Sequence, residues 1–222
     1  MSDDAYPQLL DTPVRRRRKD ERPAELIAAA VELFTEKGYA ATRLDDVAAR
    51  AGVSKGTLYL YFENKEALFR AVIREGILPV LEQGEIVLSR FEGSAAALLR
   101  ELLLGWWALV GKSRFGGIPK LMLSEARNFP EIATYYHEAV ISRGRALLRA
   151  ALQRGIAAGE FRPVDIEVAI DVIFAPVLLL AVWRHAWCVC DAGHDPDEYL
   201  ATHLDLLLRG LAVGTPGSGK SS

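Results

Sequence analysis

The sequence predicts an all-α protein in which a small three-helix unit precedes a larger helical domain. Apolar residues recur at helical spacing through most of the chain, and no long segment alternates with the period of two that marks a strand. Two short helical patterns also meet at Gly52, which is the arrangement of a helix-turn-helix. With 222 residues, of which 50% are hydrophobic, the chain is long enough for both units.

The first predicted domain, residues 20–80, opens with a helix that starts at Pro23, because a proline loses nothing in a first helical turn. Gly38 is expected to end this helix, and Thr42 to cap the next one, which stops at Gly52. Ser54 is expected to cap a third helix that ends near Phe62. A fourth helix follows from its own cap, Asn64.

The third of these helices carries few core-forming residues on one side. Leu58 and Phe62 stand one turn apart and are expected to pack inward with Val53. The residues left outward are Gly56, Thr57, Tyr59 and Leu60, with Lys55 in the first turn. In a helix-turn-helix the second helix of the motif enters the DNA major groove, so this surface predicts base contacts.

Each candidate has a chemical role. Lys55 can reach a guanine edge, and Thr57 can bond a phosphate or touch a thymine methyl. Gly56 costs about 1 kcal/mol relative to alanine in a helix, a cost that close approach to DNA would explain. Four further residues are placed for phosphate contacts, which supply position and much of the affinity: Thr42, Arg43, Tyr61 and Lys65.

Residues 22–75 resemble the DNA-binding domain of the tetracycline-repressor (TetR) family, with its pattern T-x-x-x-x-V-A-x-x-A-G-V-S-x-G-T-L-Y-x-Y-F-x-x-K-E-x-L. The match runs from Thr42 to Leu68, and only Tyr61 stands where the family also uses histidine. The resemblance implies a homodimer, a C-terminal domain that binds a small-molecule effector, and most often a repressor of a near-palindromic operator in double-stranded DNA.

The second predicted domain, residues 81–213, is expected to hold the effector and the dimer interface. Its predicted helices are Ser94–Val110, Ile118–Asn128, Pro130–Ala158, Asp165–Cys190 and Pro196–Ala212. The helix from Asp165 is apolar nearly all round, so one side can face its own domain and another a partner subunit. With the final helix it would form a four-helix interface, while the effector-binding residues stay unknown.

Composition and charge argue against other classes of protein. A net charge of −2 excludes a uniformly basic nucleic-acid coat protein, although residues 14–80 hold 13 Lys/Arg against 10 Asp/Glu. The longest apolar run has 12 residues, short of the roughly 20 of a membrane span, so we expect a cytoplasmic protein without membrane contact.

The two ends of the sequence are expected to lie outside the folded domains. Residues 1–19 are expected to be a disordered basic arm, in which Arg15–Lys19 is either a solvated tail or a phosphate contact. Residues 214–222 are expected to be a flexible tail.

Two alternative readings remain open at this point. Residues 214–221 match the spacing of a P-loop, but we expect a helix before them, where this chemistry needs a strand, and no helix after them, so nucleotide hydrolysis is disfavoured. The second alternative is a metal- or thiol-responsive regulator, and it is based on Cys188 and Cys190, with His185 and His194 nearby. Because no catalytic constellation stands out, we expect a protein that is not an enzyme and uses no cofactor or metal.

Overall fold

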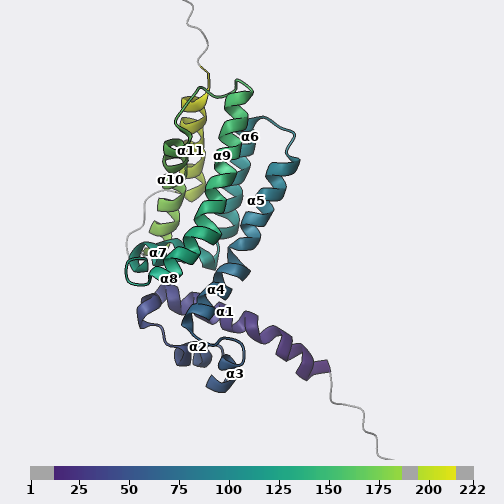
Figure 1. The fold of residues 1–222 in the computed structure, drawn as a ribbon, viewed down its shortest axis with the longest axis vertical. Helices are drawn as coiled ribbons and strands as arrows, with labels where there is room; N and C mark the ends of the chain where they lie inside the picture. The colour runs from purple at the N-terminus through teal and green to yellow at the C-terminus, as the bar shows by residue number, and fades with distance from the viewer. Residues whose placement is uncertain (1–12, 187–194, 214–222) are drawn as a thin grey trace, which may run out of the picture.

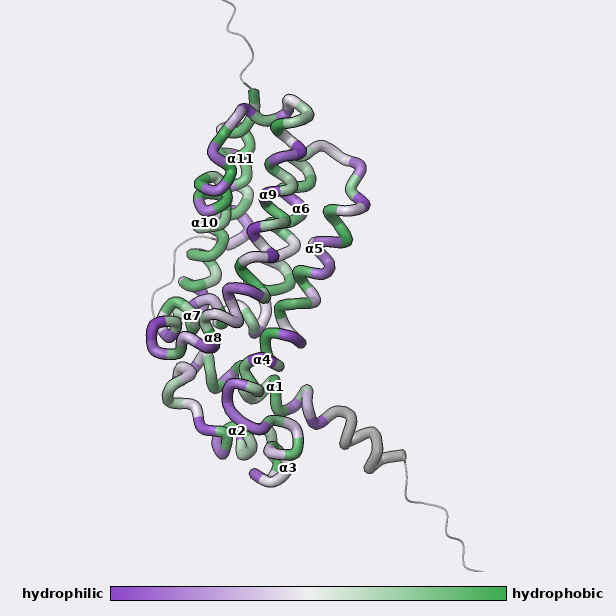
Figure 2. Tube along the Cα trace, in the orientation of Figure 1, coloured by the Kyte–Doolittle hydropathy of each residue, from purple (hydrophilic) through white to green (hydrophobic). Residues whose placement is uncertain are grey.

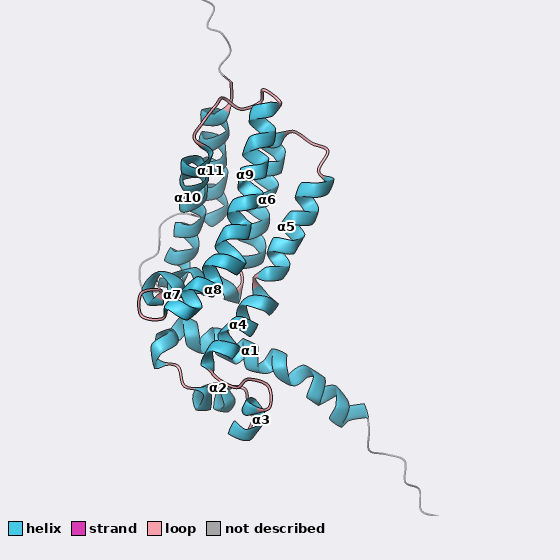
Figure 3. Cartoon of the chain, viewed as in Figure 1, coloured by secondary structure: helices cyan, strands magenta, loops and turns pink. Residues whose placement is uncertain are grey.

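The computed structural model describes residues 13–186 and 195–213, and side chains from residue 22 onward. No strand occurs within these residues, as Figure 3 shows, and a single β-bridge pairs Phe161 with Ala212. The all-α prediction is confirmed.

The N-terminal helices pack as one unit at the lower end of the molecule in Figure 1. They are α1 (Pro13–Ala41), α2 (Leu44–Arg50), α3 (Lys55–Tyr59) and α4 (Lys65–Gly76). Gly38, with φ 84° and ψ 166°, breaks the end of α1 and turns the chain toward α2. Their core is built on buried aromatic rings, Phe34, Tyr39 and Phe69, whose centroids lie 5.4 to 6.1 Å apart.

The start of α1 differs from the prediction. The helix begins at Pro13, so residues 13–19, expected as part of a disordered arm, are described as helical, and Pro23 lies inside the helix instead of in its first turn. Arginine and lysine are good helix formers, and this explains why the run Arg15–Lys19 continues the helix once α1 is anchored in the core.

Helix α5 (Leu78–Arg90) connects the two parts of the molecule and was not among the predicted helices. It spans the predicted domain boundary at residues 80–81. Arg143 of α9 (Ser142–Ala157) holds it through two hydrogen bonds of 2.9 Å to Glu85. A Cβ on Gly84 would lie 2.8 Å from Leu147 Cδ1, so glycine permits the close crossing of α5 and α9.

The larger part is a bundle whose long helices run side by side in Figure 1. It contains α6 (Ala95–Trp106), the π-helical turn η1 (Trp107–Gly111), the 3₁₀ turn η2 (Arg114–Gly117), α7 (Ile118–Glu125), α8 (Pro130–Tyr136), the π-helical turn η3 (His137–Ile141), α9 (Ser142–Ala157), α10 (Ile166–Ala186) and α11 (Pro196–Leu211). The short helices α7 and α8 lie between the bundle and the N-terminal helices. Apart from the short turn η2 and the last residue of η1, these elements fall within the predicted helices.

Helix α10 is predominantly hydrophobic along its length, as Figure 2 shows. By length and composition alone it could cross a membrane, a test that core helices also pass. Only 28% of the most apolar 18-residue stretch of this helix is buried in the single chain. Its exposed apolar residues include Val168, Val172 and Leu179, which share one face of the helix.

Several sequence features fall outside the described residues. The P-loop pattern at 214–221, Cys188, Cys190 and His194 are among them, so these alternatives gain no structural description. Within residues 13–186 and 195–213, no three His, Cys, Asp or Glu side chains gather as a metal site would require.

Candidate DNA-binding surface

The turn between α2 and α3 has the backbone geometry that a helix-turn-helix needs. Gly52 adopts φ 66°, a left-handed conformation that glycine takes without strain. The Val53 N–H then donates to Ala48 O at 2.9 Å. Ser54 caps α3 as predicted, because its Oγ accepts a hydrogen bond from the Thr57 N–H at 3.1 Å. The orientation of α3 against α2 is therefore fixed locally.

Helix α3 separates an inward from an outward face, as the sequence predicted. Leu58 is fully buried and Phe62 is 7% exposed, so both belong to the core. The helix ends at Tyr59, one turn earlier than predicted. Tyr59 is 46% and Leu60 82% exposed. These two residues place apolar surface at the outer end of α3.

Lys55 is paired before any DNA is present. Its Nζ lies 2.9 Å from Asp45 Oδ1 on α2, and this hydrogen bond raises the pKa of the lysine. The same Nζ lies 5.9 Å from the centroid of the Tyr59 ring. The exposed Arg43 is close enough to oppose the rise in the pKa of Lys55, so two cations share this surface.

The small residues of α3 behave differently from each other. A Cβ built on the exposed Gly56 would meet only Ser54 Oγ, at 3.8 Å, so nothing within the protein demands a glycine. Thr57 is half-buried, and its hydroxyl lies 2.8 Å from Ser54 Oγ. A phosphate contact from Thr57 must therefore share or replace that hydrogen bond.

Two of the predicted phosphate contacts serve the protein's interior instead. Thr42 is 1% exposed, and its Oγ1 lies 2.7 Å from Gly38 O and 3.1 Å from Leu33 O. Its hydroxyl is thus buried and bonded within the protein, and the phosphate contact from this side chain stays a prediction; the N-cap of α2 is Arg43 instead of Thr42. Lys65 Nζ donates to Tyr39 O at 2.6 Å and to Ala40 O at 3.1 Å.

The signal for these internal roles was the glycine at position 38. A chain that leaves a helix through a glycine exposes carbonyl groups that need donors. Lys65 supplies them from the start of α4, and burial lowers the pKa of its ammonium. Tyr61, the fourth predicted phosphate contact, is half-buried where the chain leaves α3.

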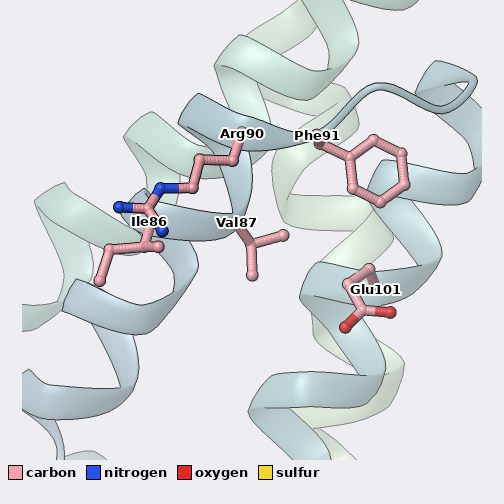
Figure 4. A pocket seen from close by; sticks show the side chains of 5 residues that line it. All are labelled: Ile86, Val87, Arg90, Phe91 and Glu101. Carbon is pink, nitrogen blue, oxygen red and sulfur yellow. The ribbon is translucent and has the colours of Figure 1, made fainter.

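A shallow groove lies between α5 and α6 and is lined by Ile86, Val87, Arg90, Phe91 and Glu101, as Figure 4 shows. Its volume is about 250 Å³. Pockets for small molecules usually measure about 300 to 1,000 Å³ and enclose most of the ligand. The groove therefore gives no basis for assigning effector-binding residues.

Comparison with known proteins identifies the family of this chain. A model of bacterial regulatory proteins of the tetR family matches residues 26–72, and a model of the tetracyclin repressor-like C-terminal domain matches residues 92–193. The uncharacterized HTH-type transcriptional regulator YdeS of Bacillus subtilis is 32% identical over 169 residues, covering 73% of this chain and 80% of that protein. The chain belongs to the TetR family.

Other TetR-family proteins are similar over nearly their whole length. The HTH-type transcriptional repressor KstR2 of Rhodococcus jostii is 31% identical and covers 87% of this chain and 93% of its own. The crystal structure of PfmR from Thermus thermophilus superposes with a TM-score of 0.68 at 28% identity, covering 85% of this chain and 99% of that one. TetR-family regulators bind operator DNA and small-molecule effectors and form dimers, and such regulators are generally not enzymes.

Proposed function

We propose that this chain is a cytoplasmic, homodimeric repressor that reads a near-palindromic operator with α3 and leaves it when a small molecule binds. The observation that carries the proposal is the two-sided character of α3. Leu58 is buried in the hydrophobic core of the N-terminal helices, whereas Lys55, Tyr59 and Leu60 face outward. The exposed Gly56 lies among them and leaves room for close approach to the groove.

The residues of this surface divide into two roles in the proposal. Lys55, Gly56, Tyr59 and Leu60 contact base edges or the groove floor, and changing them alters sequence preference. Arg43, Thr57 and Tyr61 contact phosphates, and changing them weakens binding to all sequences alike.

The dimer is proposed to form through α10 and α11. Val168, Val172 and Leu179 line one face of α10, with exposed fractions of 59%, 64% and 42%. Leu206 of α11 is 68% exposed. An apolar surface of this kind supports burial against a second copy, because a two-fold pair of such faces is self-complementary. Two copies would then present two α3 helices to two half-sites.

The effector is proposed to shift the dimer between two conformations, only one of which fits the operator spacing, and this requires unequal affinity for the two. The Fatty acid metabolism regulator protein of Bacillus subtilis is 26% identical over 87% of this chain and 98% of its own. The crystal structure of FadR from Bacillus subtilis, which superposes on this chain with a TM-score of 0.69, contains stearoyl-CoA. Acyl-CoA thioesters are for these two reasons the first compounds to screen.

The test is selection of genomic fragments by the wild-type protein and by Lys55→Ala and Tyr59→Ala. Arg100→Ala is the matched control, because it removes one exposed cation on α6, away from α3. The proposal expects one enriched palindromic motif for the wild type and the control, and an altered motif for both α3 variants. An unchanged motif in both α3 variants would refute the assignment of α3 as the reading helix.

A further inference from the structure

Residues 38–42, where the chain turns from the end of α1 toward α2, are held by three side chains, one of the turn itself and two from other helices. Thr42 reaches back to Gly38 O and Leu33 O. Lys65, from the start of α4, donates to Tyr39 O and Ala40 O. The third side chain comes from the other part of the molecule: Glu125, at the end of α7, accepts a hydrogen bond from the Ala40 N–H on its Oε1 at 3.2 Å.

Glu125 is a buried carboxylate with a specific place at this turn. It is 8% exposed, and glutamate is buried only where partners compensate its charge. A Cβ on Gly38 would lie 2.9 Å from its Oε1, so a side chain at position 38 would crowd the carboxylate. The positive φ of Gly38 and the approach of Glu125 thus occur at the same point.

The same segment of the bundle contributes a second contact one turn later. The Phe129 N–H donates to Glu125 O at 3.0 Å, which fixes the two residues relative to each other. The Phe129 ring meets the Tyr39 ring edge-on with centroids 4.8 Å apart. Lys65 Nζ lies 4.5 Å from the centroid of the Tyr39 ring and 5.9 Å from that of Phe129.

An electrostatic interaction between Glu125 and Lys65 also connects the bundle with the N-terminal helices. Burial lowers the pKa of Lys65, and the carboxylate of Glu125 acts against that fall. The charged form of Lys65, which holds the carbonyls of the turn, is therefore favoured by a residue of the bundle. The junction also contains apolar packing, which is less directional, such as Gly117 of η2 against Thr35 Cγ2 of α1.

We infer that Glu125 is a positioning residue for DNA binding: its hydrogen bond to the Ala40 N–H sets the orientation of α2 and α3 relative to the bundle, and hence the half-site spacing that a dimer accepts. The chain passes from Ala40 to the start of α2 at Leu44 within four residues, so the turn and α2 move together. This inference rests on the proposed function.

The test uses the duplex that the intact wild-type protein selects most strongly, together with the same duplex lengthened or shortened by one base pair between its half-sites. Glu125→Ala removes the acceptor. Glu125→Asp keeps the charge but draws the carboxylate back by one methylene, whereas Glu125→Gln keeps an acceptor oxygen at the same reach. Tyr135→Phe is the matched control, because it removes a longer contact of 3.5 Å between α8 and Arg70 O.

The expected result is a change in spacing preference. Glu125→Ala and Glu125→Asp should lose about tenfold of the wild-type preference for the selected spacing, the size of a lost hydrogen bond to a charged group. Glu125→Gln and Tyr135→Phe should keep the preference within about twofold, since one retains the acceptor and the other removes only a weak contact. Exchange of the Ala40 amide should also be faster in the Ala and Asp variants.

The outcomes separate this inference from the proposed function. A folded Glu125→Ala or Glu125→Asp protein that keeps the wild-type spacing preference overturns the positioning role. If Glu125→Ala does not fold, the spacing preference of Glu125→Asp decides whether Glu125 has the positioning role. If neither variant folds, the test is hydrogen exchange of the Ala40 amide in Glu125→Gln. Slow exchange there supports the contact, and rapid exchange overturns it. A wild-type protein that selects no duplex overturns the proposed function and this inference with it.

Discussion

Lys55 Nζ lies 2.9 Å from Asp45 Oδ1, so the first cation of α3 is already engaged by a residue of α2 in the DNA-free protein. The pair is largely exposed, with side-chain accessibilities of 61% and 43%, and an exposed pair of this kind adds little to stability. Its consequence is for binding: DNA must compete with Asp45 for the ammonium of Lys55.

Asp45→Asn is expected to tighten binding. The change frees Lys55 and removes a negative charge from the surface that meets phosphates, so affinity should rise for operator and scrambled DNA, by about three- to tenfold at low salt. Anisotropy titrations across a salt series measure this.

The matched control is Asp46→Asn, which removes the same charge from the neighbouring residue. Asp46 pairs with Lys37 at the longer distance of 3.5 Å. If both variants gain equally, the effect is one of net charge and the specific competition for Lys55 is disproved.

Gly56→Ala is expected to separate stability from binding. The free protein has room for the methyl group, so the melting temperature should stay the same or rise, with alanine favoured by up to about 1 kcal/mol in a helix. The methyl group should nevertheless weaken operator binding at least about tenfold, since it would stand between α3 and the groove floor.

Calorimetry and anisotropy on the same preparation of Gly56→Ala measure both effects. Gly105→Ala is the control, because a Cβ built on Gly105 has no neighbour within 4 Å and the residue lies in α6, away from α3. Operator affinity equal to that of the wild type in Gly56→Ala would show that the glycine does not serve DNA approach.

Val172→Glu is expected to break the dimer. The valine is 64% exposed in the single chain and lies in the middle of the apolar face of α10, so a carboxylate there would be buried unpaired in a dimer. Sedimentation should show a monomer, and operator affinity should fall with it.

Ile86→Glu supplies the comparison for Val172→Glu. Ile86 is also an exposed apolar residue, 45% accessible, but it lies on α5 beside the groove of Figure 4. This variant should sediment like the wild type. A dimeric Val172→Glu protein would contradict the proposed interface.

Glu167 is expected to make the bundle sensitive to acid. Hydrogen bonds from Arg149 and then Arg145 on α9 lower the pKa of this carboxyl to about 2. A lowered pKa means that the stabilising contribution is complete above the ordinary value of 4.5 and is lost as the pH falls toward 2. The difference in melting temperature between wild type and Glu167→Gln should therefore shrink between pH 5 and pH 2. A difference that is constant with pH would argue against the pairing.

The sequence predicted the local features of the fold well, because their causes lie within a few residues. Ser54 and Asn64 cap their helices as expected, each accepting a hydrogen bond from the N–H three residues on. The inward and outward faces of α3 followed from spacing alone. Helix α5 was missed because it lacks a polar N-cap and contains Gly84; it is stabilised by contacts with distant residues such as Arg143.

The roles that depend on distant parts of the chain could not be predicted. Thr42 and Lys65 looked like surface residues beside DNA, yet the turn at Gly38 takes both for its own carbonyl groups. Glu125 had no assignable role, since its partner Ala40 lies 85 residues earlier. In this chain, the role of a polar side chain could be predicted from sequence where its hydrogen-bonding partner lies a few residues away, as for Ser54, but not where the partner is distant, as for Glu125.

The most direct test of the account is fluorescence anisotropy of the purified protein with DNA from upstream of its own gene, across a salt series with scrambled competitor. The account predicts tight binding that survives the competitor and weakens steeply with salt, as expected where several phosphates are contacted. If that DNA binds no better than scrambled DNA, and fragments selected genome-wide show no common motif, the account of α3 as a sequence-reading helix is contradicted.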